Sequence, residues 1–377
     1  MSNPPGSLIS HFSQLPDPRL ERCQAHRLID IVVLAICGAI CGADSWVAIA
    51  EFGQSKYEWF KSFLALPNGI PSHDTFGRVF ARLSPAHFQD CFRAWIQSVI
   101  GQLDQEIVPL DGKTLRRSFD RASGKAPLHM VNAWAANNRL VLGQYPSEGP
   151  VDEICIIPEL LRVLSLKGCI VTVDALGCQK SIAAQILSQQ ADYVLAVKNN
   201  QPKLLAQVRQ VFDRPERQLR RDPSVDYYET RENGHGRREV RRYWITEQLE
   251  DFPQQAAWEG LRSFAMVESQ RHIGKQLTVE RRYYISSLED NARRFAQAVR
   301  AHWGIENSLH WVLDMAFDED HCRVRLGHAP ENLAVLRQIA LNLLQQEKTA
   351  NVGIQTKRLK AGWDHRYLTK VLSPDPL

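Results

Sequence analysis

The 377-residue chain has few of the features that assign a protein to a class directly. Its eight cysteines form no Cys-x-x-Cys pair, and several lie in apolar runs, as free thiols do in proteins of a reducing cytoplasm. The N-terminus lacks the layout of a signal peptide, and the chain contains neither an internal repeat nor a low-complexity segment. The net charge of +4 is small, so partners must be inferred from where the charges lie.

Long hydrophobic runs are also scarce. The only candidate for a membrane span runs from Leu28 to Ala43, but it is short, contains Asp30 and includes two glycines. A span needs about 20 apolar residues, so this segment predicts a buried helix instead. The chain is 44% hydrophobic and long enough for two or three globular units with their own cores.

The positive charge is concentrated in two stretches. Residues 203–242 hold eleven basic and seven acidic residues, and residues 348–370 hold six basic residues and one acid. At least one tyrosine and a tryptophan lie within or directly beside each stretch, a mixture that suits phosphate contact and base stacking on a nucleic acid. The same composition is equally typical of a solvated helix face or strand edge.

The first hundred residues have the pattern of short helices. Ser72 is a plausible N-cap for one of them, and Ser84-Pro85 places a cap and a first-turn proline before the next. With Arg78 and Arg82 on the first, the pair could form a helix-turn-helix-like DNA reader, while a plain helical bundle remains the alternative.

The pattern changes near Ile107 to strands and helices in alternation. Three strand-like segments are followed by a helix, a strand, a helix and a strand, which is the order of a ribonuclease-H-like core. One strand, CIVTVD, is continuously apolar and is therefore expected to be buried on both faces. The strands are predicted at 107–111, 128–135, 140–144, 169–174 and 193–197, and the helices at 158–166 and 180–190.

These patterns predict an α/β protein with five parts. The first is an N-terminal all-helical domain, which holds the candidate helix-turn-helix. A ribonuclease-H-like catalytic core follows, which is interrupted by a β-rich insertion and ends in a basic tail. The predicted bounds are 1–100 for the helical domain, 101–212 for the first part of the core, 213–290 for the insertion, 291–345 for the C-terminal core helices and 346–377 for the tail.

Two predicted strands end in an aspartate. Asp111 follows the strand IVPL, and Asp174 follows IVTV. Ligands gather at the carboxyl ends of strands in open α/β sheets, so both acids are well placed for chemistry. An aspartate at a strand end is as often an ordinary turn or cap residue.

A third acid, Glu306, lies in the helical stretch HWGIENSLHWVLDMAF among Trp303, Ile305, Leu309 and Trp311. Charged carboxylates are rarely buried without a partner or a cation, whereas the two tryptophans are most simply core anchors. In a ribonuclease-H-like arrangement the first and fourth strands are neighbours and a late helix crosses them, which would bring the three acids together.

Three converging carboxylates suit Mg²⁺ or Mn²⁺ rather than zinc. Two such ions about 4 Å apart can clamp a phosphodiester, one activating water or a 3′-hydroxyl and the other stabilising the leaving oxygen. Four rival acids follow Glu306, and geometry alone does not choose among them: Asp314, Asp318, Glu319 and Asp320.

Histidines and arginines near Glu306 have open roles at this point. His302 and His310 lie one turn to either side of Glu306 and could orient ligands or contact phosphates. Arg323, Arg325 and His328 form a small basic patch that could grip DNA or could simply be solvated.

The chain also resembles a known family over many segments. Ten segments together resemble the H-repeat-associated proteins. They are LPDPR, AIAEFG, LPNGIPSHDTFGRVFARL, LDGKTLRRS, VTVDALGCQKSIA, ADYVLAVKNNQ, HGRREVR, RYYISS, HWGIENSLHWVLD and EDHCRVRLGHAPENLA. These are DDE transposases of bacterial insertion sequences. The likeness extends from about His11 to Leu372.

This resemblance implies a Mg²⁺- or Mn²⁺-dependent transposase that cleaves at the terminal inverted repeats of its element and joins the ends to target DNA. Asp111, Asp174 and Glu306 match the acidic triad. A homodimer on double-stranded DNA in the bacterial cytoplasm is expected. Within the motifs and charged stretches, the expected DNA contacts are Lys113, Arg116, Arg237, Arg238, Arg300, His302, His310, Arg323 and Arg325.

Related transposases carry a Tyr, Arg, Glu, Lys signature around the third acid, and this chain departs from it. Val299 stands in the place of Tyr, His302 in the place of Arg and Leu313 in the place of Lys, with Arg300 as a candidate substitute for the arginine. These departures bear on the DNA-end contacts and on any hairpin intermediate. Two alternatives therefore stay open: a repeat-binding protein that no longer transposes, and a nuclease that cuts without joining.

Overall fold

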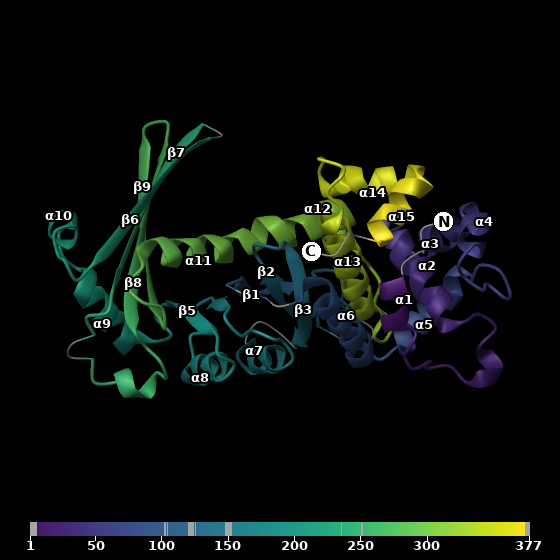
Figure 1. Ribbon diagram of the computed structural model, residues 1–377, viewed down its shortest axis with the longest axis horizontal. Coiled ribbons are helices and arrows are strands. Elements are labelled where there is room, and N and C mark those ends of the chain that lie inside the picture. Colours follow the sequence, from purple (N-terminus) through teal and green to yellow (C-terminus); the bar gives the residue numbers. More distant parts are fainter. Residues whose placement is uncertain are drawn as a thin grey trace.

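The computed structural model describes residues 6–373 except 102, 104, 120–123, 125, 148–152, 235, 250 and 251. Figure 1 shows an elongated molecule with helices at one end, a sheet through the middle and long hairpins at the other end. The strands are β1 (Ile107–Thr114), β2 (His129–Ala135), β3 (Leu140–Ser147), β4 (Ile170–Val173), β5 (Asp192–Val197), β6 (Asp226–Gly234), β7 (Arg237–Thr246), β8 (Ser263–Ile273) and β9 (Gln276–Ser286).

Over the described residues these strands form one sheet in the order β3-β2-β1-β4-β5-β9-β8-β7-β6. The first three strands are antiparallel, and β4 and β5 then add parallel to β1. The prediction that the first and fourth strands are neighbours is confirmed, with Leu110 opposite Val173. The carboxyl ends of β4 and β5 therefore lie at one edge of the sheet. Strand β1 continues past this edge to Thr114, beyond the predicted end at Asp111, so Asp111 lies within β1 one residue after its last pair with β4.

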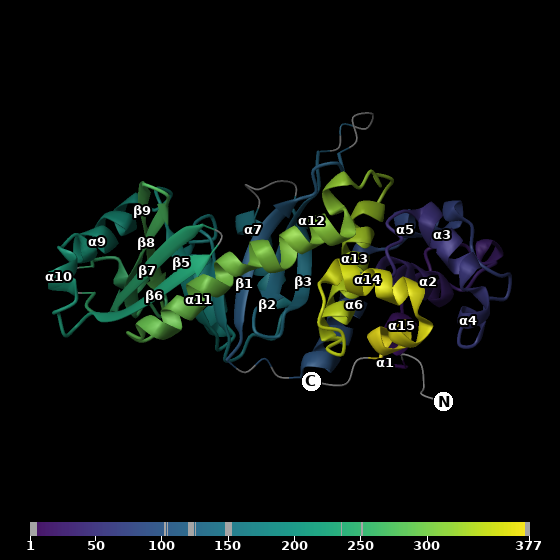
Figure 2. The ribbon, with the colours of Figure 1, turned by 90° about the horizontal axis from the view of Figure 1, so that it is seen from above.

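Helices cover both faces of this core. On one side lie α7 (Glu153–Arg162) and α8 (Lys180–Ser188), and on the other α11 (Ala292–Ile305) crosses β1, β4 and β5 (Figures 1 and 2). Helix α7 begins five residues before the predicted helix and contains Pro158 in its interior, where proline cannot donate a backbone hydrogen bond. The mixed α/β class is confirmed.

The β-rich segment continues the core sheet. Its strands are β6 to β9, and β9 pairs antiparallel with β5, Val197 opposite Tyr283. The strands beyond this pairing extend as two long hairpins, and α9 (Pro202–Phe212) and α10 (Glu216–Leu219) pack beside them (Figure 1). The β-rich segment and the core therefore share one continuous sheet.

The N-terminal region is helical, as predicted. Ser45 and Ser72 accept hydrogen bonds from the N–H groups of Ala48 and Thr75 and so cap the helices they precede. The elements are α1 (Gly6–Phe12), η1 (Glu21–Cys23), α2 (Leu28–Ile40), α3 (Trp46–Ser55), α4 (Tyr57–Lys61), α5 (His73–Arg82) and α6 (Pro85–Ile100).

Helix α2 is the apolar segment noted in the sequence. It is buried almost throughout, and its Asp30 carboxylate accepts a hydrogen bond of 3.0 Å from the N–H of Leu66. Among the described residues, none of the helices is both long enough and apolar enough to cross a membrane.

The C-terminal helices pack against the N-terminal ones. Helix α13 (Ala329–Gln346) lies between α2, α5, α6 and strand β3, with nearly every residue buried. The segment expected as a basic tail forms α14 (Ile354–Trp363) and α15 (His365–Leu372), while residues 374–377 of that segment lie outside the described residues. Both helices contact α13, so the two ends of the chain share one core.

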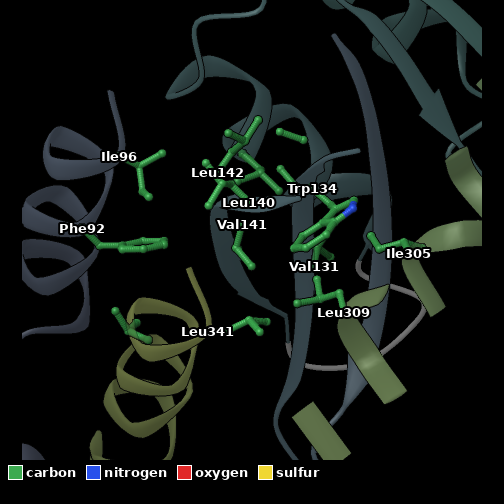
Figure 3. Close-up of a cluster of buried hydrophobic side chains, with 14 of the residues drawn as sticks. Phe92, Ile96, Val131, Trp134, Leu140, Val141, Leu142, Ile305, Leu309 and Leu341 are labelled. Atoms are coloured by element: carbon green, nitrogen blue, oxygen red, sulfur yellow. The ribbon is translucent and has the colours of Figure 1, made fainter. Parts of the chain in front are cut away.

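A long helix carries the third acid across the sheet. Helix α11 continues through a π-helical turn, Glu306–His310, into α12 (Trp311–Phe317). Figure 3 shows Ile305 and Leu309 directed toward Val131 and Trp134 of β2. These two buried aliphatic residues flank Glu306 and anchor the helix at that point.

Candidate active site

Backbone pairing brings Asp111 and Asp174 to the same edge of the sheet. Asp111 follows Leu110 in β1, and Asp174 follows Val173, the residue opposite Leu110 in β4. Both side chains are partly buried. Two acids that follow paired residues of parallel strands are near neighbours by construction.

The π-helical turn presents Glu306 to this edge. The Glu306 carboxylate is largely exposed, and its Oε2 lies 3.2 Å from Nδ1 of His310. The same His310 nitrogen lies 3.6 Å from Oδ2 of Asp111. Asp111, Glu306 and His310 each place one ligand atom within 4.8 Å of the others. Single π turns inside α-helices often mark functional sites, because they redirect the side chains around them.

The electrostatics of Asp111 reflect this crowding. Burial raises the pKa of its carboxyl to about 7, and the negative charges of Asp174, Glu153 and Glu306 add to the effect. A cluster of acids that repel one another in this way is stabilised by a bound cation. His310 is buried, which lowers its pKa, and in the described region its Nε2 has no hydrogen-bond partner.

Asp174 combines the two roles that its position allowed. Its Oδ1 accepts hydrogen bonds from the N–H groups of Leu176 and Gly177, at 2.9 and 3.3 Å, so it closes the turn after β4. It does not belong to the tight group of Asp111, Glu306 and His310, although its charge raises the pKa of Asp111. The turn fixes one oxygen and leaves the carboxylate at the sheet edge.

The rival acids have partners of their own. The Lys113 ammonium lies 2.5 Å from Asp314 and 2.8 Å from Glu319, and it also donates to the carbonyl oxygen of His310. Lys113, expected to contact DNA, is therefore mostly enclosed and joins β1 to α12. Asp320 pairs with Arg116, and Asp318 pairs with His321. Glu306 differs from these four acids because, among the described residues, its side chain pairs with His310 beside Asp111 and with no lysine or arginine.

A buried pair beneath Asp111 was not predicted from the sequence. Glu153 lies 2.5 Å from Nε2 of His129, and a Cβ on Gly112 would lie 2.1 Å from the same Glu153 oxygen. Gly112 is therefore needed so that this pair can approach the strand. The Asp-Gly sequence was visible, but nothing in the pattern indicated which distant residues would fill the space beside it.

His302 is partly buried and contacts the core sheet. Its Nδ1 lies 3.0 Å from Oγ1 of Thr172 in β4, and burial lowers its pKa to about 4. His302 thus connects α11 to the strand that ends at Asp174. The neutral ring is suited to orienting the helix.

The tryptophans beside Glu306 differ from the prediction. Trp311 was expected to be a core anchor, but it is 57% exposed, so that prediction is wrong. Trp303 is half-buried, and the guanidinium of Arg282 lies over its ring at 4.7 Å. Periodicity could not separate the two faces, because the π turn changes the direction of the residues that follow it.

The remaining expected DNA contacts are spread over the surface. Arg300 lies 3.4 Å from Glu232 of the β6 strand, and Arg325 donates to the carbonyl oxygen of Arg117 while it stacks over Phe119. The exposed arginines are Arg116, Arg237, Arg238 and Arg323.

Two family models match the sequence. The one described as "DDE_Tnp_1-associated" matches residues 9–96, and the one described as "Transposase DDE domain" matches residues 102–343, which is more than half of the chain. The chain belongs to the DDE transposase family. The resemblance noted in the sequence is thereby confirmed.

Relatives of this transposase cover nearly its full length. The "H repeat-associated putative transposase YhhI" of Escherichia coli (strain K12) is 39% identical over 97% of each chain. The "Putative transposase YncI" of Escherichia coli O157:H7 is 40% identical over 97% of this chain and 94% of the relative.

One solved structure shows a weaker similarity. The cryo-EM structure of a piggyBac transposase synaptic complex with hairpin DNA covers 98% of this chain and 80% of that chain, with 12% identity and a TM-score of 0.41. Because this similarity is low, the family assignment depends on the sequence matches.

Proposed function

We propose that this chain is the transposase of a bacterial insertion sequence, which binds terminal inverted repeats, cleaves there and transfers the strands to target DNA. The observation that carries the proposal is the meeting of Asp111, Asp174 and Glu306 at one sheet edge, where the pKa of Asp111 is raised to about 7. Strand order and the crossing helix α11 support a ribonuclease-H-like core for residues 101–212 and 291–345.

The donor set fits Mg²⁺ or Mn²⁺. Asp111, Asp174 and Glu306 offer carboxylate oxygens, the ligands that these hard cations prefer. The mutual repulsion of the acids fits a site that is completed by a cation. When bound, a pair of divalent ions would activate water or a 3′-hydroxyl and stabilise the leaving oxygen.

The protein's own residues set the geometry of that reaction. Backbone hydrogen bonds to Asp174 fix one carboxylate, and His310 orients Glu306 toward Asp111. Asp111 would release its proton when a cation binds, because the charge of the cation would favour the ionised carboxylate over the protonated form that burial and the neighbouring acids favour. Lys113 holds α12 against β1 and so keeps the two sources of ligands at a fixed separation.

The partner in this proposal is double-stranded DNA in the bacterial cytoplasm. Two element ends have to be joined in concert, so a homodimer on DNA is expected. Exposed cations on the DNA-facing surface, such as Arg238 and Arg323, would contact backbone phosphates.

The test uses the DNA that flanks the gene as the substrate duplex. Asp111→Asn, Asp174→Asn and Glu306→Gln should each reduce Mg²⁺-dependent cleavage by at least about a thousandfold while duplex binding stays within about threefold of wild type. Asp290→Asn, at an exposed acid away from the site, is the matched control. Full activity in any one of the three site variants would reject the triad.

The same assay separates the alternatives. Binding without cleavage by the wild type would indicate a repeat-binding protein that no longer transposes. Cleavage without strand joining would indicate a nuclease on the same core.

A further inference from the structure

A cavity lined by cationic residues lies at the carboxyl end of β5. A cavity of about 320 Å³ opens there between the end of β5, helix α9 and strand β9. Among the described residues that line it, Glu280 is the only acid. The cationic residues of the lining are Lys198, Arg209, Arg281 and Arg282. Helix α9 packs against β8 and β9, so these elements hold the cavity open as one unit (Figure 2).

Two of the four cations are not neutralised. Arg281 pairs with Glu268 at 2.8 Å and Arg282 pairs with Glu280 at 2.7 Å. Lys198 and Arg209 are exposed, and within the described ranges neither has a carboxylate partner. The Arg209 guanidinium lies 5.4 Å from the centre of the Tyr283 ring, which limits its motion.

The cavity lies at the same edge of the sheet as Asp111 and Asp174. Lys198 follows β5 as Asp174 follows β4, and these strands are parallel neighbours, so both residues lie at the same sheet edge. The positive charges of Lys198 and Arg282 also act on His302, whose ring contacts Thr172 two residues before Asp174. Arg282 stacks on Trp303, three residues before Glu306.

A solvated surface would account for single lysines or arginines. Arg281 and Arg282 are consecutive residues of β9 and extend from opposite faces of the sheet, so the unpaired positive charge at the cavity comes from Lys198 and Arg209. Self-repulsion among converging cations is relieved when an anion binds between them. The anions that a DNA-cleaving site brings to its own border are the backbone phosphates that flank the scissile one.

We infer that Lys198 and Arg209, supported by Arg281 and Arg282, bind backbone phosphates of the duplex that enters the triad. This inference rests on the proposed function. Contacts to phosphates position DNA but carry little sequence information, so the cavity would fix the register of the scissile bond.

The test compares two double variants of the full chain on the duplex copied from the DNA flanking the gene. K198Q/R209Q removes the two unpaired cations. K203Q/R217Q removes two exposed cations of α9 and α10 that do not line the cavity, so it matches the first variant in charge. Binding is measured as a function of salt concentration, and the cleavage position is mapped on the same duplex.

For K198Q/R209Q we expect binding at low salt to weaken by roughly tenfold or more and the slope of log K against log salt to fall by roughly two. Replacing single phosphates by neutral methylphosphonates should weaken wild-type binding at one or two positions near the cleavage point. The same replacements should leave the K198Q/R209Q variant unaffected. The K203Q/R217Q control should stay within about twofold of wild type.

Failure of the inference is distinct from failure of the proposed function. If wild type cleaves the duplex but the two double variants behave alike, the cavity does not bind DNA. If wild type binds without cleaving and only K198Q/R209Q is weakened, the cavity binds DNA but the chain is not an active transposase. Absence of any binding by wild type would overturn both.

Discussion

At the scale of residues, Asp111 is the acid whose chemistry the fold alters most clearly. Its carboxyl is partly buried and faces three other acids, Asp174, Glu153 and Glu306, so its pKa rises from 3.8 to about 7. An acid whose pKa is raised by folding lowers the stability of the folded protein at neutral pH.

We expect Asp111→Asn to stabilise the metal-free protein at pH 8. An acid whose pKa is raised on folding contributes stability that is complete below the unfolded pKa and is lost as pH rises through about 7. The neutral asparagine avoids that loss, so its melting temperature should exceed that of wild type by about 2–8 °C at pH 8 and by little near pH 4. Thermal unfolding in chelator would measure this, with Asp290→Asn as the control. Equal shifts in both variants would contradict it.

Lys113 should be as important for stability as for the site. Replacing it by methionine leaves the buried Glu319 and the half-buried Asp314 without their shared cation, so we expect the free energy of unfolding to fall by about 3 kcal/mol. Arg116→Met is the matched control, because that side chain is 80% exposed and its ion pair should contribute less than about 1 kcal/mol. Denaturant unfolding of both variants tests the difference, and equal losses would show that Lys113 is not structurally special.

At the scale of elements, the π-helical turn decides where Glu306 points. Each residue of an α-helix rotates the chain by about 100°, so removing one residue from the five of this turn would rotate α11 relative to α12. We expect deletion of Ser308 to abolish Mg²⁺-dependent cleavage while the helical circular dichroism signal is retained. Ser308→Ala, which keeps the turn, should remain active. A cleaving deletion variant would show that the turn does not orient the acid.

Most elements could be predicted from local pattern, and their exceptions have physical causes. Strands β1 to β5 were predicted because their runs are rich in β-branched and aromatic residues and are separated by turn signals. The helix at 158–166 was predicted to begin at Pro158, because proline favours the first turn of a helix, whereas α7 contains Pro158 in its interior. Trp311 was misplaced because a π turn leaves no signal in hydrophobic periodicity.

At the scale of the whole molecule, the two ends of the chain are joined through one buried arginine. Arg358 of α14 donates to the carbonyl oxygens of Ala39 and Ala316, lies 2.6 Å from Asp44, and stacks over Phe317. This residue therefore connects α2, α12 and α14. The segment expected as a basic tail instead supports the helix that carries Glu306.

We expect Arg358→Met to lower the free energy of unfolding by about 3–5 kcal/mol, because it leaves several buried acceptors without a donor. Arg366→Met, in the exposed first turn of α15, should change it by less than about 0.5 kcal/mol. Chemical denaturation measures both. If the Arg358 variant were as stable as the Arg366 variant, the C-terminal helices would not hold the core together.

The sequence by itself determined the α/β class, the helical N-terminal region, the strands and the three candidate acids, because propensity, periodicity and the family motifs are local in the chain. Only the tertiary structure decided that the β-rich segment shares the core sheet, that Lys113 neutralises two of the rival acids, Asp314 and Glu319, and that Glu153 and His129 form a buried pair near Asp111. These features depend on which residues meet in the folded chain, at separations of 24 positions for His129 and Glu153 and 206 positions for Lys113 and Glu319. Local sequence pattern does not predict contacts between residues that are distant in the chain.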